Sequence, residues 1–131
     1  MVERLQEQEL KHVRIVQADA RAVFAAFMPD NHLSAVHINF PDPWWKKRHH
    51  KRRVFSPSFV DLIHQKLQPG GHVFARTDVL DYAQLIDMIF ESNGQFESVE
   101  MEALPLTYRE KQCEIFGLPV HRRCFRKLNT P

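Results

Sequence analysis

FPDPWWKKRHHKRR, residues Phe40–Arg53, is the stretch that decides how this chain folds and what it does. It begins where the alternating apolar run AVHINF (35–40) ends, and that run is typical of a β-strand. Shortly after it comes Ser56-Pro57, a pair that often begins a helix. A strand therefore leads into this stretch and a helix follows it, so the stretch should lie at the carboxyl end of a strand.

Strand and helix patterns alternate on both sides of this stretch. Helical segments are predicted at 1–12, at RAVFAAFM (21–28), from Pro57 to the LQPGG turn (67–71), and up to Asn93-Gly94. Extended segments are predicted at VRIVQ (13–17), AVHINF (35–40), HVFARTD (72–78), FESVEM (96–101) and HRRCFRK (121–127). Residues 106–120 are predicted as a loop with at most one helical turn. This order predicts one α/β domain over residues 1–131, with a mostly parallel sheet.

Positive charge is concentrated in one place. The 131 residues carry a net charge of +2, but residues 46–53 alone hold six Lys/Arg, which leaves a net charge of about −4 for the rest. A local basic patch on a mildly acidic body favours a polyanion bound at one surface. No apolar run is long enough to span a membrane and no signal peptide is apparent, so we expect a cytoplasmic protein.

Asp42 lies between two prolines, which stiffen the backbone on both sides of its carboxylate. One interpretation is a turn aspartate that caps a loop. The other is a carboxylate held in a preset direction toward a substrate or a cationic cofactor.

The tryptophans and the basic run are suited to nucleic acid. Trp44 and Trp45 can stack on a base, although one of the two is expected in the core. The run from Lys46 to Arg53 is either a solvated loop or a set of phosphate contacts, to which His49 and His50 could add donors. No metal site is predicted, because His49 and His50 are adjacent and point apart on an extended chain.

Two more acidic residues follow predicted strands and have two interpretations each. Asp19 is either the N-cap of the next helix or a contact to a nucleoside. Asp78 is either a helix cap or an acceptor for the edge of a base. Because ligands gather at the carboxyl ends of strands in open α/β sheets, Asp19, Asp42 and Asp78 are candidates for one pocket.

These motifs together resemble those of the bacterial tRNA (guanine-N7-)-methyltransferases, which have a class I, Rossmann-like fold and use S-adenosylmethionine. The matching pieces are PDPW with the basic run, the LQPGG turn, Thr77-Asp78, and TYRE (107–110) followed by Gly117. PDPW with the basic run is the specific part, whereas LQPGG occurs in many methyltransferases.

The resemblance implies a role for each matching residue. Asp42 would be the catalytic carboxylate and, with Asp19, would lie in the cofactor site. The residues implied in substrate binding are Lys46, Asp78, Thr107, Tyr108, Arg109 and Glu110. The residues implied in RNA binding are Arg48, His49, His50, Lys51, Arg52 and Arg53.

The sequence departs from this family at the cofactor loop. The family has a glycine-rich loop after its first strand, whereas the glycines here are Gly70, Gly71, Gly94 and Gly117. The resemblance therefore implies an incomplete fold, the carboxyl-terminal portion, with an antiparallel last strand and without the first two strands. We expect little or no S-adenosylmethionine binding by this chain alone, and an unprotected sheet edge at 35–40 that favours self-association.

Three functions remain open from the sequence. The first is methylation of guanine N7 in tRNA, with this chain supplying the tRNA-binding and catalytic-carboxylate half. The second is a noncatalytic RNA-binding remnant of such an enzyme. The third is an amino-group methyltransferase, because DPWW resembles the N/D-P-P-aromatic motif; its second proline is replaced here by Trp44.

Overall fold

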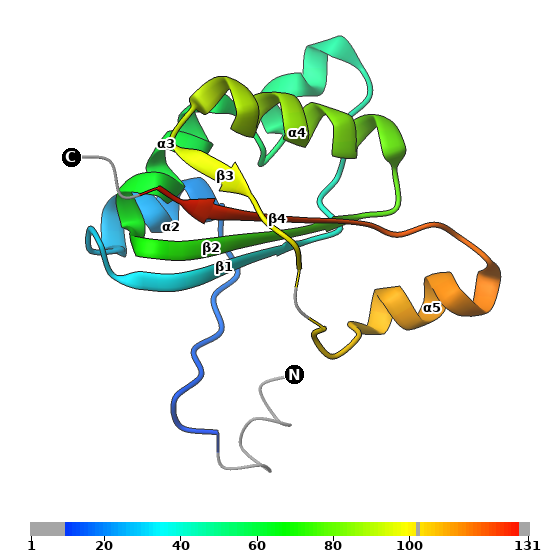
Figure 1. The fold of residues 1–131 in the computed structure, drawn as a ribbon, viewed down its shortest axis with the longest axis horizontal. Helices are drawn as coiled ribbons and strands as arrows, with labels where there is room; N and C mark the ends of the chain where they lie inside the picture. The colour runs from blue at the N-terminus through cyan, green and yellow to red at the C-terminus, as the bar shows by residue number, and fades with distance from the viewer. Residues whose placement is uncertain (1–9, 102, 129–131) are drawn as a thin grey trace.

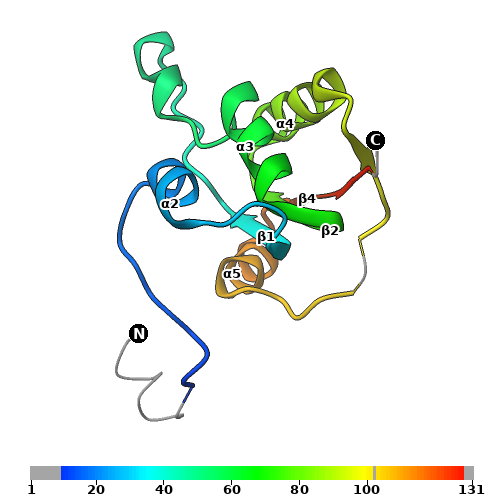
Figure 2. The ribbon, with the colours of Figure 1, turned by 90° about the vertical axis from the view of Figure 1, so that its left-hand side faces the viewer.

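The computed structural model describes residues 10–101 and 103–128, which fold around one four-stranded sheet (Figure 1). In chain order the elements are α2 (Ala20–Phe27), β1 (Leu33–Asn39), η1 (Lys47–Arg52), α3 (Pro57–Lys66), β2 (Leu67–Thr77), α4 (Leu80–Asn93), β3 (Phe96–Ser98), α5 (Tyr108–Phe116) and β4 (His121–Lys127). Figure 2 shows α3 and α4 above the sheet and α5 below it. The two core helices thus share one face of the sheet.

The strand order is β1-β2-β4-β3. β1 and β2 run parallel, whereas β4 is antiparallel to both β2 and β3. The predicted α/β class and the antiparallel last strand are confirmed. The described sheet is mixed rather than mostly parallel. Because Asn39 pairs with Arg76, the carboxyl ends of β1 and β2 lie next to each other.

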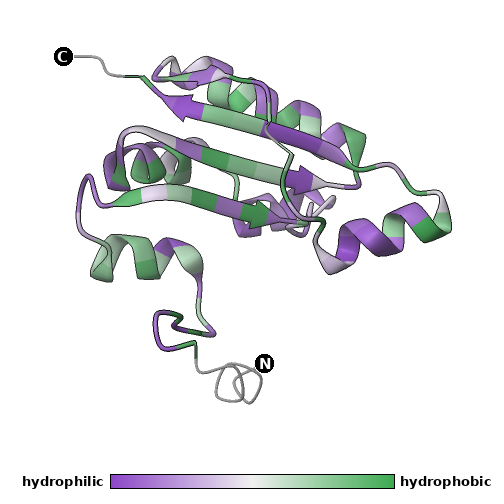
Figure 3. Cartoon of the chain, turned by 60° about the horizontal axis from the view of Figure 1, so that its bottom comes forward, coloured by the Kyte–Doolittle hydropathy of each residue, from purple (hydrophilic) through white to green (hydrophobic). Residues whose placement is uncertain are grey.

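Val13–Gln17 is not a strand, so this prediction was wrong. The segment has no regular structure, and Ile15 and Val16 are exposed on it. Figure 3 shows it apart from the strands. A β-branched run becomes a strand only when a neighbour pairs with its backbone, and no described strand lies beside this one. β1 consequently pairs with β2 alone among the described residues.

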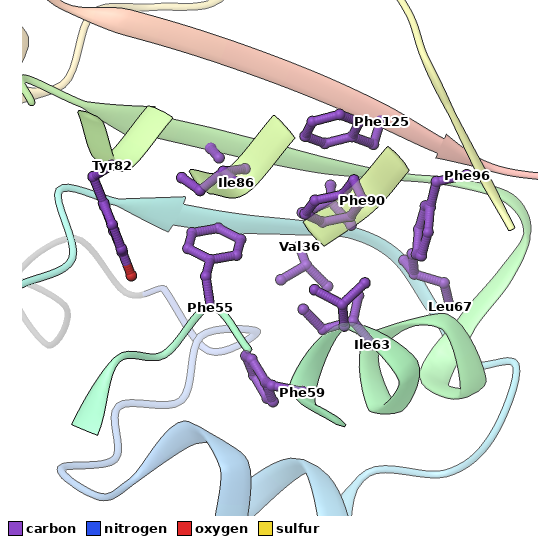
Figure 4. Close-up of a cluster of buried hydrophobic side chains, with 13 residues drawn as sticks. Val36, Phe55, Phe59, Ile63, Leu67, Tyr82, Ile86, Phe90, Phe96 and Phe125 are labelled. Carbon is purple, nitrogen blue, oxygen red and sulfur yellow. The ribbon is translucent and has the colours of Figure 1, made fainter. Parts of the chain in front are cut away.

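The hydrophobic core lies between the sheet and the helices α3 and α4 (Figure 4). Ser56 caps α3 as predicted, because its hydroxyl accepts a hydrogen bond from the Phe59 amide at 3.2 Å. The rings of Phe90 on α4 and Phe125 on β4 stack with their centroids 3.9 Å apart. This packing holds β2 and β4 firmly under the helices, and the site described below extends from this rigid part.

The late segment contains a helix that the sequence analysis missed. α5 has nine residues and begins with a capping box, in which Thr107 and Glu110 bond each other's backbone amides. Gly117 ends it with φ +68°. The T-x-x-E spacing was the signal for this start, so the loop prediction for 106–120 was wrong over 108–116.

The other boundaries differ in detail. β2 begins at Leu67, five residues earlier than predicted, because the LQPGG turn continues the pairing with β1 past an irregularity. The predicted 96–101 strand is only three residues long as β3. Most of the helix predicted at 1–12 lies outside the described residues.

No helix within 10–101 and 103–128 combines the length and the apolar character that a membrane crossing requires.

Candidate catalytic and nucleic-acid site

The segment from Phe40 to Trp44 leaves the carboxyl end of β1 in an unusual conformation. Phe40 has φ +51° and Trp44 has φ +47°, a region that residues other than glycine seldom occupy. The Phe40 amide donates to the Arg76 carbonyl at 2.7 Å, which ties the start of the segment to β2. Such strain persists where the surroundings hold the backbone, and it concentrates at functional sites. The Pro41–Pro43 turn is therefore bounded by two strained aromatic residues.

Asp42 projects from this turn into solvent. Its side chain is exposed, and among the described residues its carboxylate accepts no hydrogen bond. The buried Tyr82 hydroxyl lies near enough to respond to its charge. Burial raises the pKa of Tyr82, the Asp42 carboxylate raises it further, and Arg53 opposes the rise. The structure thus does not show Asp42 as the cap of its own loop.

The basic segment, Lys46–Arg53, contains the short 3₁₀ helix η1 and presents most of its charge outward. Lys46, Lys47, Arg48, His50, Lys51 and Arg52 are exposed, whereas His49 and Arg53 are partly buried. Figures 1 and 2 show η1 projecting from the molecule on the side of the sheet where α3 and α4 lie. A projecting cationic helix of this kind can approach a phosphate backbone without rearrangement of the core.

The two tryptophans have different environments. Trp44 packs within the basic segment, with the Arg52 guanidinium 5.1 Å from its ring centre and the His49 ring edge-on at 5.6 Å. Trp45 is 55% exposed. Neither belongs to the main core, in contrast to the expectation for one of them. Trp45 is the ring that remains accessible for stacking on a base.

Two arginines hold the basic segment against the body. Arg21 of α2 donates to the Lys51 carbonyl at 2.9 Å, and Arg53 donates to the Pro43 carbonyl at 2.5 Å. Arg21 also forms an ion pair with Asp19, whose carboxylate caps α2 through the Arg21 amide at 2.9 Å. These hydrogen bonds lower the pKa of Asp19. Asp19 is thus an N-cap in this structure, and it is linked through Arg21 to the backbone of the basic segment.

Asp78 and the start of α5 form a second polar group, at the carboxyl end of β2. The Arg109 guanidinium donates to the Asp78 carboxylate at 2.8 Å, and both groups are partly exposed. Tyr108 is 77% exposed, whereas Glu110 is buried. The four residues 107–110 therefore point in different directions: Thr107 and Glu110 build the helix start, and Tyr108 and Arg109 face outward.

Glu110 lies at the centre of a buried ion-pair network that the sequence analysis missed. Its carboxylate contacts Arg76 at 3.1 Å and Arg122 at 2.5 Å, and Arg76 also donates to Asn39 at 2.8 Å. Burial acts to raise the pKa of Glu110, but the hydrogen bonds from Thr107 and Arg122 outweigh it and the pKa is lowered. An arginine inside an otherwise apolar strand was the available signal, because a buried cation needs a carboxylate partner.

A cavity of 360 Å³ adjoins this network. Arg76, Glu110 and Arg122 line it together with Met101, Ala103, Leu104, Leu106 and Glu114. Asp42 is not among its lining residues. The structure thus brings Asp42 together with the basic segment, and Asp78 together with Arg109. These two groups follow neighbouring parallel strands, and no hydrogen bond or ion pair joins them within the described residues.

The structure combines a Rossmann-like α/β sheet with Asp42 and Asp78 in the segments that follow its parallel strands β1 and β2. The family comparison gives the class of protein. The chain belongs to the family described as "Putative methyltransferase", whose model matches residues 1–120.

Individual relatives agree with this family, and solved structures agree with the fold. The chain is 40% identical over 105 residues to a tRNA (guanine-N(7)-)-methyltransferase from Thiobacillus denitrificans, an alignment that covers 80% of this chain and 46% of the relative. A second of that name, from Myxococcus xanthus, is 38% identical over 121 residues, covering 86% of this chain and 58% of the relative. The fold is similar to that of an rRNA methylase from Streptococcus thermophilus, with a TM-score of 0.56 at 13% identity, covering 98% of this chain and 65% of that one. The chain spans about half the length of the curated relatives it matches.

The residues present do not make a complete S-adenosylmethionine site. Such a site needs backbone that a cofactor can approach closely, which glycines after a strand provide. Here Gly94 and Gly117 end helices, and Gly70 and Gly71 lie in the irregular first part of β2. Asp19, the other residue implied in cofactor binding, is engaged by Arg21.

Proposed function

We propose that this chain carries the tRNA-recognising, catalytic-carboxylate half of an S-adenosylmethionine-dependent tRNA (guanine-N7-)-methyltransferase. The observation that carries the proposal is the exposed Asp42 on a strained turn that is bonded directly to the basic segment. The names of the relatives support the substrate, and the family supports methyl transfer. A tRNA substrate is consistent with the cytoplasmic location expected from the sequence.

The chemistry of guanine fits a carboxylate in this position. Guanine N7 has a lone pair and no proton, so a substituent can be added there without a base that first removes a proton. A carboxylate can accept hydrogen bonds from the N–H groups of guanine and offset the positive charge that develops on the ring. Asp42 is proposed in that role, with Asp78, Arg109 and Tyr108 at the adjacent strand end as contacts to the same nucleotide.

The basic segment is proposed to bind the tRNA backbone. The side chains of Lys46, Arg48, His49, His50, Lys51 and Arg52 would contact phosphates, and Trp45 would stack on an unpaired base. Each phosphate contact releases counterions, so affinity should fall steeply with salt.

The salt dependence of tRNA binding tests this proposal. In Lys51→Ala/Arg52→Ala, the slope of log affinity against log salt should fall by about 1.5 units, because two phosphate contacts are lost. The measurement is fluorescence anisotropy with labelled, unmodified tRNA from low to moderate salt. The control is Lys11→Ala/Arg14→Ala, which removes the same charges from the N-terminal segment that Figure 1 shows on the other side of the sheet from η1. Equal slopes for wild type and Lys51→Ala/Arg52→Ala would remove the basic segment from the interface.

A methyl-transfer assay distinguishes the proposed enzyme from the noncatalytic RNA-binding remnant. Methyl transfer to unmodified tRNA is measured with this chain and with a chain extended at its amino end by the family's cofactor loop. Transfer by the extended chain alone supports the proposed enzyme. Binding without transfer by either chain supports the RNA-binding remnant, and methylation of an exocyclic amino group supports the third function.

A further inference from the structure

Arg53 differs from the rest of the basic segment because its side chain turns inward. Its Nε donates to the Pro43 carbonyl at 2.5 Å, and its guanidinium carbon lies 5.8 Å from the ring centre of Tyr82. Tyr82 is 1% exposed and lies next to Phe55 at the edge of the core (Figure 4). Lys51 and Arg52, by contrast, are exposed. The basic segment thus contains cations that face solvent and one cation, Arg53, that bonds to the turn before it.

The Pro43 carbonyl oxygen is an anchor point of this turn, because it accepts a hydrogen bond from Arg53. Prolines have no amide hydrogen, so Pro41 and Pro43 can be anchored through their carbonyl oxygens alone. The start of the turn is held by the Phe40 amide on the Arg76 carbonyl, and its end is held by Arg53 on Pro43. With Phe40 and Trp44 both at positive φ, the turn needs such anchors to keep its strained shape.

We propose that Arg53 is a positioning residue, which clamps the Pro41–Pro43 turn and thereby aims the Asp42 carboxylate, and that it does not contact RNA. This inference rests on the proposed function, in which Asp42 contacts the guanine. Arginine suits the role because its planar guanidinium can donate to a carbonyl and pack on an aromatic ring at the same time. An RNA contact at Arg53, as the family resemblance implies, makes the opposite prediction about salt.

The test compares Arg53→Gln with Lys51→Gln, which loses the same charge two residues away. Lys51→Gln should lower the salt slope of tRNA binding by about 0.7 to 0.9 units, whereas Arg53→Gln should leave the slope unchanged and lower affinity about fivefold at every salt concentration. An equal loss of slope in both variants would overturn the inference while leaving the proposed function intact.

A double-mutant cycle with Asp42→Asn separates aiming from general damage. If Arg53 acts through Asp42, Arg53→Gln should change tRNA affinity less than about twofold in the Asp42→Asn background. Lys51→Gln should have the same effect in both backgrounds. A fivefold loss from Arg53→Gln in both backgrounds would show that Arg53 does not act through the carboxylate, and the inference would fail.

A readout without RNA tests the clamp on the turn separately from the proposed function. In a Trp45→Phe background Trp44 is the sole tryptophan of the chain and reports on the turn directly. Acrylamide quenching of Trp44 should rise in Arg53→Gln but not in Lys51→Gln. If wild type fails to bind tRNA, the proposed function fails, and unchanged quenching would additionally overturn the clamp. Where Arg53→Gln does not unfold cooperatively, Arg53→Lys is measured in the same way, since it keeps the charge but not the planar donor.

Discussion

At the scale of single residues, the buried carboxylate of Glu110 joins three elements through Arg76, Arg122 and the Thr107 amide. It neutralises Arg76, whose side chain is 3% exposed, and it also closes the capping box of α5. Removing one member of a buried ion pair leaves the other charged and without compensation. Glu110 therefore holds the end of β2, the start of β4 and the start of α5 together.

Glu110→Gln should lower the free energy of unfolding by about 3 kcal/mol at pH 7, because Arg76 loses its anionic partner. The measurement is urea unfolding followed by circular dichroism. Glu91→Gln on the exposed face of α4 is the control and should change stability by less than about 0.5 kcal/mol. A loss for Glu110→Gln as small as that of the control would show that the network contributes little.

The same residue predicts a pH dependence. Since the folded-state pKa of Glu110 is lowered, its contribution is present above the ordinary glutamate pKa of about 4.3 and is lost as pH falls through the lower folded value. Wild type should therefore lose stability below about pH 4.5 more steeply than Glu110→Gln. Parallel stability curves for the two proteins in this acidic range would contradict the assignment.

At the scale of elements, the irregular first part of β2 depends on two glycines of the LQPGG turn for different reasons. Gly70 has φ +78°, and a Cβ added there would meet nothing within 4 Å, so its requirement is conformational. At Gly71 a Cβ would lie 2.9 Å from the Gln68 carbonyl oxygen and 3.2 Å from that of Ser34. The second glycine is thus required because a side chain there would collide with the backbone of the turn itself and with the backbone of β1.

Gly71→Ala should destabilise the protein by about 1 to 3 kcal/mol, because the added methyl group forces backbone atoms apart. Gly70→Asn is the matched control at the neighbouring position. It should cost less than about 1 kcal/mol, since asparagine tolerates a left-handed conformation and the space is open. Thermal or urea unfolding measures both variants, and a larger loss for Gly70→Asn would reverse the explanation.

At the scale of the whole molecule, the sheet ends at β1 with an edge that no described strand covers. Unpaired edges readily pair with another chain. The exposed Ile15 and Val16 of the irregular segment 13–17 add a second run with strand character that has found no partner within the described part. The β1 edge and the segment 13–17 are therefore two stretches of backbone available for pairing with another strand.

The isolated chain should bind S-adenosylmethionine far more weakly than micromolar, because its described glycines make no cradle after a strand. Isothermal titration calorimetry measures this directly, with the extended chain as the positive control. Micromolar binding by the isolated chain would contradict the prediction and would require another cofactor contact.

The isolated chain should also self-associate through the β1 edge. Sedimentation velocity over a range of concentrations should show dimers or larger species, and Ala35→Lys on exposed β1 should shift them toward monomer. Glu114→Lys on α5 is the control for a new positive charge elsewhere on the surface. A chain that remains monomeric at about 100 μM, a concentration at which exposed edges commonly associate, would show that the edge is not available.

Much of the fold could be predicted from local patterns. Ser56-Pro57, Asn93-Gly94 and the apolar spacing between them mark α3 and α4, because caps and hydrophobic periodicity act within a few residues. The α5 capping box was also visible in the sequence, although the segment was interpreted as a loop. Val13–Gln17 could not be judged in this way, since its conformation depends on strands that would have to lie beside it.

In the candidate site, too, some properties follow from the sequence and others only from the tertiary structure. The sequence by itself determined that a stiff carboxylate follows a strand and precedes a concentrated positive charge, since prolines and lysines impose these properties wherever the chain lies. The tertiary structure alone decided which cations face outward and which are anchors. Arg21, Arg53 and Arg76 reach partners 30, 10 and 37 residues away, and such hydrogen bonds arise only after packing brings the chain segments together.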